Sequence, residues 1–233
     1  MQKGLLRVEA DGEAVVLSRP NRFVVELEID GVRDFAHLRD PGRLRELIYP
    51  GNRVLVKRAE GSGRKTSWDV LAADSPAGWV FVNSGYHRRL GELIIEGGFL
   101  PYTVKRYSAE VKRGKSRLDY LLELDGGRMW VELKGCTLVK DGVALFPDAP
   151  TSRGARHVLE LAEAVEDGDR ALLLVLVFRE DALRFLPNAE TDPDFAAAYW
   201  NALRAGVEVL PILIGYNSIW LTFEGFLPAG VAL

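Results

Sequence analysis

The chain has 233 residues, of which 48% are apolar and 27% charged, and its formal net charge is -3. These values are typical of a folded globular protein with one or two domains and exclude intrinsic disorder. The longest apolar run, residues 171–178, is too short to cross a bilayer, and the first residues lack the apolar core of a signal peptide. We therefore expect a cytoplasmic protein without a membrane partner. The single cysteine, Cys136, excludes an intrachain disulfide.

The charge is unevenly distributed along the chain. Residues 31–117 contain 17 Lys and Arg against 9 Asp and Glu, whereas residues 158–233 contain 4 against 12. One interpretation is that a polyanion approaches one side of the molecule; the other is that folding mixes the two kinds of charge on the surface. If a polyanion is the partner, DNA or RNA is the natural class. The sequence does not indicate an oligomeric state.

Residues 5–82 consist of short stretches with strand-like alternation and one brief helical stretch after Pro41-Gly42. This pattern predicts a small OB-type barrel, and we assign residues 1–82 to a nucleic-acid-binding domain. Its candidate phosphate contacts are three basic residues, Arg43, Arg64 and Lys65, the last two in a predicted loop. Trp68 follows the last of these loops. Its ring either stacks on a base or packs in the core, and aromatic residues more often do the latter.

Near residue 85 the apolar period changes from two to about 3.6, which predicts a helix over residues 87–97 and a new domain over residues 83–233. The order that follows is a three-strand meander, a helix, the buried strand 171–178, a helix and another buried strand. This order predicts an α/β domain with a mixed sheet flanked by helices. Glu92 on the first helix either reaches the charged face of the meander or is a solvated helix residue.

The meander ends in a hairpin formed by the runs RLDYLLEL and RMWVELK, which the turn residues Asp125-Gly126-Gly127 separate. Side chains alternate between the two faces of a strand. The apolar side chains Leu118, Tyr120 and Leu122 are therefore expected on one face. The opposite face is expected to carry the charged side chains of both strands, Arg117, Asp119, Glu123, Arg128, Glu132 and Lys134.

Two carboxylates beside an ammonium group are what a divalent cation next to a phosphate requires. We therefore predict Asp119, Glu132 and Lys134 as catalytic residues, with Asp119 and Glu132 as ligands of Mg²⁺ or Mn²⁺ and Glu92 as a third ligand. The alternative is an ordinary polar sheet face, because cross-strand charge pairs contribute about 0.2–1 kcal/mol without any catalytic purpose.

The run that follows the hairpin leads into a helix for which Thr151 is the expected N-cap. Arg153 and Arg156 fall in its first turns, where the helix dipole disfavours cations by about 0.3–1 kcal/mol. A bound anion explains this placement, because a helix N-terminus and guanidinium groups together hold a phosphate well. We predict that these two arginines, with Arg117 of the hairpin, bind nucleic acid.

With these residues identified, the chain resembles the sugar fermentation stimulation protein A (SfsA) family from about residue 21 to residue 210. The resemblance is carried by NRFVVELEIDG, PGRL, RKTSWDV, SRLDYLLE with VELK, and above all TLVKDGVALFPDAPTSRGARH. It implies an OB-like domain joined to a restriction-endonuclease-like domain of the PD-(D/E)xK type. It also implies metal carboxylates at Asp119 and Glu132, a catalytic lysine at Lys134, and DNA binding of low sequence specificity. Leu118 replaces the proline of the nuclease motif.

Two functions from different classes follow. The first is a DNA-binding protein with a Mg²⁺-dependent phosphodiesterase, or nuclease, site. The second is a non-catalytic, sequence-nonspecific DNA-binding regulator of sugar metabolism that retains the nuclease scaffold. The second predicts binding that weakens steeply with salt, ignores chelators and yields no cleavage products.

Overall fold

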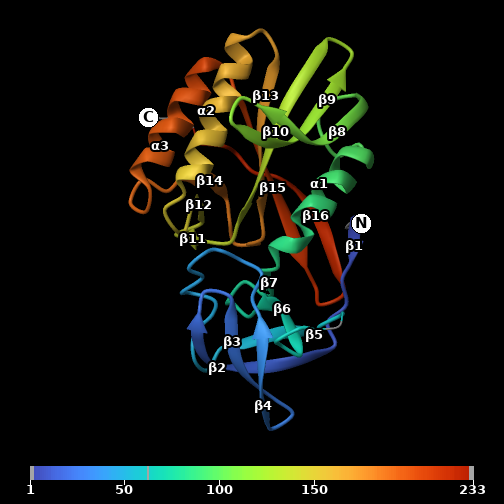
Figure 1. The fold of residues 1–233 in the computed structure, drawn as a ribbon, viewed down its shortest axis with the longest axis vertical. Coiled ribbons are helices and arrows are strands. Elements are labelled where there is room, and N and C mark those ends of the chain that lie inside the picture. The colour runs from blue at the N-terminus through green and yellow to red at the C-terminus, as the bar shows by residue number, and fades with distance from the viewer. Residues whose placement is uncertain (1–2, 62, 231–233) are drawn as a thin grey trace.

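The computed structural model describes residues 3–61 and 63–230 of the chain. It has two parts, a small barrel and a larger sheet flanked by helices (Figure 1). The expected fold class, an OB-like barrel followed by a mixed sheet with helices on its faces, is confirmed. No helix in the described ranges is both long enough and apolar enough to span a membrane.

Strand β3 of the barrel shows the alternation of more and less buried side chains that a strand with one face on a core produces. Its strands pair in the order β4-β3-β2-β5-β6-β7, and a parallel pairing of β4 with β6 closes the sheet on itself. The bounds are β2 Gly12–Asn21, β3 Val24–Ile29, β4 Val32–His37, β5 Arg53–Arg58, β6 Trp68–Ala73 and β7 Val80–Phe81.

The brief helix expected after Pro41-Gly42 does not form. Leu44 has a positive φ of 46°, which an α-helix does not accommodate, and residues 45–51 form turns instead. The amide of Asn52 holds this turn by donating to the carbonyls of Leu47, at 2.6 Å, and Asp74, at 3.0 Å. The apolar residues that suggested a helix are buried. The prediction was therefore right about which side chains are buried and wrong about the backbone conformation.

The larger sheet has seven strands in the order β1-β16-β15-β13-β10-β9-β8, with a parallel centre formed by β10, β13 and β15. Its first strand, β1, lies within the range 1–82 assigned to the barrel domain, yet it pairs antiparallel with β16. The bounds are β1 Lys3–Arg7, β8 Val104–Arg113, β9 Ser116–Leu124, β10 Gly127–Cys136, β13 Arg170–Val177, β15 Glu208–Tyr216 and β16 Trp220–Phe226.

Helices cover both faces of this sheet (Figure 1). Helices α2 (Ser152–Glu166) and α3 (Pro193–Ala205) pack on one face, and α1 (His87–Glu96), which follows the one-turn helix η1 (Ser84–Tyr86), packs on the other. The core beneath α1 is continuous with the barrel core, since Phe81 contacts Phe178 and Tyr216 at ring distances of 5.9 and 5.0 Å. The two domains therefore share an apolar junction.

A third sheet was not predicted from the sequence. Its strands β11 (Val139–Lys140), β12 (Val143–Phe146) and β14 (Arg184–Pro187) pair in that order. It lies at the end of the larger sheet nearer to the barrel (Figure 1). The end of β12 and the loop that leads from it to α2 lie beside the carboxyl end of β10, since Cys136, Phe146 and Asp148 line a common pocket. Parallel strands commonly present functional residues at their carboxyl ends.

Candidate functional site

The site begins where the pairing of β9 with β10 ends. The two strands pair from Leu124 opposite Gly127 to Tyr120 opposite Val131, and in the described part of the chain their pairing goes no further. Beyond this point a side chain replaces the backbone as hydrogen-bond partner: Asp119 Oδ2 accepts a hydrogen bond from the Leu133 amide at 2.8 Å. The Asp119 side chain therefore lies between the two strands, close to Glu132 and Lys134.

The end of the pairing also corrects the expected apolar face. Tyr120 and Leu122 pack in the core beneath α1, as alternation predicts. Leu118 instead packs in the core beneath α2 and α3. The regular alternation fails here because the part of β9 before Tyr120 is not paired with β10. Leu118 and Tyr120, on either side of Asp119, therefore need not face the same layer of the core.

Glu132 is the most deeply buried acid of the site, with 2% of its surface exposed. Its Oε1 accepts hydrogen bonds from Lys134 Nζ and from His157 Nδ1, the latter at 2.5 Å. Its Oε2 is buried and has no hydrogen-bond partner in the described part of the chain. Burial alone would raise the pKa of Glu132, but the donors His157 and Lys134 outweigh it and lower that pKa.

Asp119 is affected in the opposite direction. Burial, and then the charge of Glu132, raise the pKa of Asp119 from 3.8 to about 6. Two neighbouring carboxylates, one of them with an unpartnered buried oxygen, fit a divalent cation, which would relieve their repulsion and supply the missing partner. The set suits Mg²⁺ in particular, because Mg²⁺ is usually held by one or two carboxylates with water and phosphate oxygens completing its shell.

Glu92 does not join this pair. Its carboxylate binds Arg88 and Arg89 of its own helix at 3.2 and 3.3 Å. The described residues contain no group of three or more His, Cys, Asp or Glu side chains placed to hold a metal ion. The structure thus brings together Asp119, Glu132 and Lys134 but not the third predicted ligand, and the geometry favours the solvated-helix interpretation of Glu92.

A hollow of about 530 Å³ opens beside these residues, and we call it the basic hollow. Its lining residues come from the β8–β9 hairpin and the first turns of α2: Lys112, Lys115, Ser116, Arg117, Arg153, Arg156 and His157. Within residues 3–61 and 63–230, none of its five Lys and Arg side chains forms an ion pair with a carboxylate. His157 lines the hollow and also contacts Glu132, so the hollow adjoins the carboxylate pair.

The hairpin is fastened to α2 at its tip. Arg156 Nε donates to Ser116 Oγ at 3.1 Å, and Ser116 Oγ donates to the buried Glu160 at 2.9 Å. Arg113 adds a bond to the Glu160 carbonyl at 3.2 Å and an ion pair with Asp167 at 2.7 Å. The three predicted phosphate contacts of this domain, on the hairpin and on α2, therefore line one cavity rather than separate surfaces.

The start of α2 is equally well fixed. Thr151 Oγ1 accepts a bond from the Gly154 amide at 3.0 Å, which confirms Thr151 as the N-cap. The Thr151 amide donates to Asp192 Oδ2 at 2.7 Å, and the other oxygen of Asp192 caps α3 through the Phe195 amide at 2.9 Å. The side chains that α2 presents to the site are therefore positioned by two helices.

The three predicted barrel residues lie in three different places. Arg43 lines an open hollow of about 470 Å³ between the domains, together with Arg22, Arg45 and the loop Ala149-Pro150 that leads into α2. We call it the junction hollow. Because Pro150 lines it and Arg153 lines the basic hollow, the two hollows flank the start of α2.

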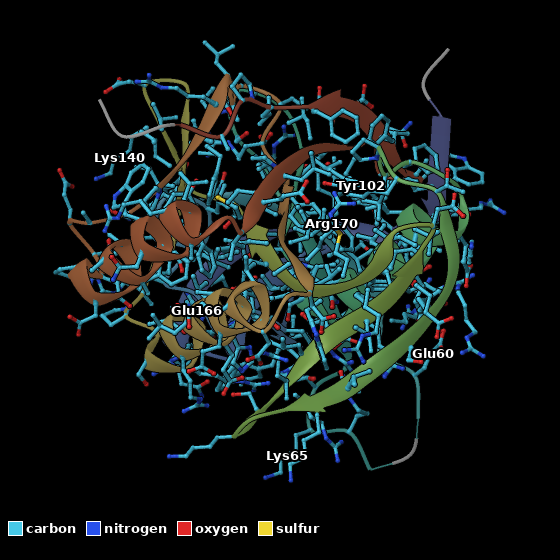
Figure 2. All side chains as sticks on the ribbon, turned by 90° about the horizontal axis from the view of Figure 1, so that it is seen from above. Glu60, Lys65, Tyr102, Lys140, Glu166 and Arg170 are labelled. Carbon is cyan, nitrogen blue, oxygen red and sulfur yellow. The ribbon has the colours of Figure 1, made fainter. Side chains whose placement is uncertain are left out.

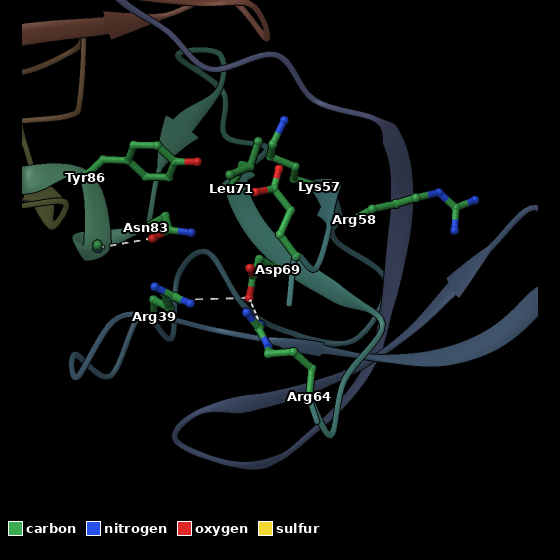
Figure 3. Close-up of a pocket in the computed structure, with 10 residues that line it drawn as sticks. Arg39, Lys57, Arg58, Arg64, Asp69, Leu71, Asn83 and Tyr86 are labelled. Carbon is green, nitrogen blue, oxygen red and sulfur yellow. Dashed lines mark hydrogen bonds and ion pairs between the residues drawn. The ribbon is translucent and has the colours of Figure 1, made fainter. Parts of the chain in front are cut away.

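Arg64 lies elsewhere, in a barrel pocket of about 210 Å³ (Figure 3). Arg64 is paired there with Asp69, and Arg39 lies 4.0 Å from the same carboxylate. Lys65 is exposed, and Figure 2 shows its loop projecting to the same side of the molecule as the β8–β9 hairpin, drawn in green.

Trp68 is 7% exposed in the barrel core, and the Arg58 guanidinium lies 4.6 Å from its ring centre. Of the two interpretations of Trp68, the structure therefore supports packing in the core.

Sequence reasoning missed four residues of this region, Lys112, Lys115, Ser116 and His157. The two lysines and the serine were within reach, because they lie in or next to the Gly114-Lys115 turn that joins the first two strands of the meander. His157 had a weaker signal in its helical spacing from Arg153, since positions i and i+4 share one face of a helix. What the sequence did not contain was the contact of that face with Glu132.

Two family descriptions match the chain. The sugar fermentation stimulation protein RE domain matches residues 85–218, and the SfsA N-terminal OB domain matches residues 17–82. The chain belongs to the sugar fermentation stimulation protein family. The resemblance seen in the sequence is therefore confirmed, and the division near residue 83 coincides with the gap between the two matches.

Relatives in this family align over most of their length. A homologue from Methanococcoides burtonii is 45% identical over 96% of this chain and 94% of its own, and one from Sulfolobus acidocaldarius is 48% identical over 89% and 86%. The structure of Pyrococcus furiosus SfsA in complex with Ca²⁺ superposes with a TM-score of 0.89 at 29% identity, over 98% of this chain and 99% of that one. The family fold therefore extends over both domains.

Proposed function

We propose that this protein binds DNA and carries a Mg²⁺-dependent phosphodiesterase site at Asp119, Glu132 and Lys134. One observation carries the proposal. Among the residues that the structure describes, a buried oxygen of Glu132 has no hydrogen-bond partner, and it lies beside a second carboxylate and next to a hollow whose five cations form no ion pair. A cation would satisfy the carboxylates, and a phosphate chain would satisfy the hollow.

Each residue of the trio has a distinct task in phosphodiester hydrolysis. Mg²⁺, or Mn²⁺, held by Asp119 and Glu132 would polarise a phosphoryl oxygen and acidify a bound water. Lys134 brings a positive charge to the same place, and its bond to Glu132 fixes its direction. Such a preorganised charge stabilises the negative charge that develops on the phosphorus oxygens during attack. The Ca²⁺ named for the Pyrococcus furiosus relative supports an oxygen-ligand site in the family, because Ca²⁺ and Mg²⁺ both prefer oxygen ligands.

The hollows supply the grip on the substrate. In the basic hollow Arg153 and Arg156 hold a phosphate at the start of α2, with Arg117 opposite them on the hairpin. The strand then continues past the start of α2 to Arg43 in the junction hollow, and Lys65 contacts it from the barrel loop. Contacts of this kind are made with phosphate rather than base edges, so they predict affinity without sequence preference and leave RNA as a second substrate class.

A cleavage assay tests the proposal. Purified protein with Mg²⁺ or Mn²⁺ should cleave single- or double-stranded DNA, and Lys134→Ala and Asp119→Ala should each reduce the rate by at least about 100-fold. Lys140→Ala and Asp125→Asn are matched controls, since both residues are exposed and form surface ion pairs, with Glu190 and Lys105 respectively. Neither control should change the rate.

The alternative function, a non-catalytic DNA-binding regulator, makes the opposite forecast. It would show binding that falls with salt, persists in chelator and is unchanged by Lys134→Ala, with DNA left intact under every metal. Intact DNA with the wild type would therefore reject the phosphodiesterase site and retain only the binding function.

A further inference from the structure

His157 is a buried histidine that no part of the proposed chemistry uses. Only 2% of its surface is exposed, and both of its ring nitrogens have partners. Nδ1 lies 2.5 Å from Glu132 Oε1, and Nε2 lies 3.3 Å from Arg153 Nε. The ring thus links the carboxylate predicted to hold the metal with an arginine of the basic hollow.

The two partners determine which nitrogen carries the hydrogen. An ionised carboxylate can only accept a hydrogen bond, so Nδ1 must donate to Glu132. A guanidinium group can only donate, so Nε2 must accept from Arg153. The contacts therefore select the tautomer with hydrogen on Nδ1.

The same geometry determines which oxygen of Glu132 faces the metal. Oε1 is occupied by His157 and Lys134, whereas Oε2 has no partner within the described chain. A donor held on one oxygen restricts rotation of the carboxylate and keeps the other oxygen available. A donor that hydrogen-bonds to a metal-binding carboxylate in this way typically contributes a factor of about 10 to 100 to metal affinity.

We infer that His157 is a positioning residue that orients Glu132 toward a divalent cation and connects this carboxylate, through Arg153, to the phosphate-binding hollow. This inference rests on the proposed metal site but not on catalysis. The ring is held by α2, whose N-cap is bonded to the cap of α3, so it is a rigid support rather than a mobile side chain. Cation binding and phosphate binding are thereby placed at the two ends of one hydrogen-bonded chain.

Two substitutions distinguish the hydrogen bond that His157 donates to Glu132 from the space that the His157 side chain fills. In His157→Asn the side-chain amide takes the place of Nδ1 and can still donate to Glu132. In His157→Gln the amide takes the place of Nε2, so the donor to Glu132 is lost. Mn²⁺ binding, measured by calorimetry and by the electron spin resonance of the free ion, should weaken about 10- to 100-fold in His157→Gln. Mn²⁺ affinity should stay within about threefold of the wild type in His157→Asn, because the donor to Glu132 is kept.

A long-range ¹H–¹⁵N correlation spectrum of the intact wild-type protein reads the tautomer without any substitution, with the His157→Asn spectrum assigning the signal by its disappearance. The expected result is hydrogen on Nδ1. Unfolding in chelator checks that both variants fold. Hydrogen on Nε2, wild-type affinity in His157→Gln, or no Mn²⁺ binding by the wild type would each overturn the inference. A wild type that binds Mn²⁺ but leaves DNA intact would count against the phosphodiesterase alone.

Discussion

The basic hollow and the barrel pocket are both lined by Lys and Arg, yet their charges are balanced differently. The barrel pocket is lined by four cations, Arg39, Lys57, Arg58 and Arg64, and by two acids, Glu60 and Asp69. Figure 3 shows Arg39 and Arg64 directed toward the Asp69 carboxylate. No acidic side chain is among the described residues that line the basic hollow. The same residue types therefore leave an unbalanced charge in one place and a largely internal network in the other.

The difference matters for the partner. A cation that already pairs with a carboxylate must give up that pair, or share it, before it can neutralise a phosphate, whereas an unpaired cation only releases water and counterions. Counting basic residues along the sequence treats the two regions alike. The structure predicts that DNA affinity resides mainly in the basic hollow.

The largest effect is expected from the double substitution Arg153→Ala/Arg156→Ala. Each guanidinium that binds phosphate contributes about 1.5 kcal/mol or more as a charge-assisted hydrogen bond, so losing two should weaken DNA binding about 100-fold. The slope of log affinity against log salt should also become shallower by about 2. Fluorescence anisotropy of a labelled oligonucleotide in chelator measures both quantities without cleavage.

Two control variants give this result its meaning. Arg106→Ala removes an exposed arginine paired with Glu123 on the neighbouring strand, and Arg64→Ala removes the paired arginine of the barrel pocket. Both should leave DNA affinity within about threefold, as expected for charges that are already neutralised. If Arg64→Ala weakened binding as much as the double variant, the comparison between the two regions would be wrong.

Much of this arrangement could be predicted from the sequence, for a physical reason. Asp119, Glu132 and Lys134 lie on one hairpin, so a local rule, the alternation of side chains in strands, was enough to gather them. The Thr151 cap is equally local. The pairing of β1 with β16 joins opposite ends of the chain, and no local pattern encodes that.

The remaining site residues depended on contacts between distant segments. His157 meets Glu132 across 25 residues, and Ser116 meets Arg156 across 40. Leu44 adopts a left-handed conformation, although the spacing of the apolar residues around it indicated a helix. Even the neutralised charge of Arg64 was visible only in the fold, although Asp69 follows five residues later, because their loop must close to bring them together.

The junction between the domains contains an acid, Asp40, whose charge is poorly balanced by its surroundings. Burial raises the pKa of Asp40 from 3.8 to about 7, aided by Asp148 and opposed by the Gly42 amide, which donates to Asp40 at 2.7 Å. Because the folded state binds this proton more tightly than the unfolded state, stability should fall as the pH rises from about 4 to about 7. Asp40 is thus a charge that its surroundings do not balance.

Asp40→Asn should remove this cost. The amide oxygen still accepts from Gly42, and the uncharged group no longer repels Asp148. We expect the variant to gain on the order of 1–2 kcal/mol over the wild type at pH 8 and little at pH 4, in urea unfolding followed at both pH values. An equal gain at both pH values would show that packing, rather than ionisation, is responsible.

The smallest effect is expected from removing the carboxylate that balances the charge of the barrel pocket. Asp69→Asn keeps the shape of the barrel pocket and an acceptor for Arg64, but it removes the negative charge that holds Arg64 and Arg39. The released cations should behave like those of the basic hollow, so DNA affinity should rise about twofold to fivefold, with a steeper salt dependence. Anisotropy over a salt series measures the change. Unchanged affinity would mean that the position of the barrel pocket, and not its balanced charge, keeps it away from the DNA.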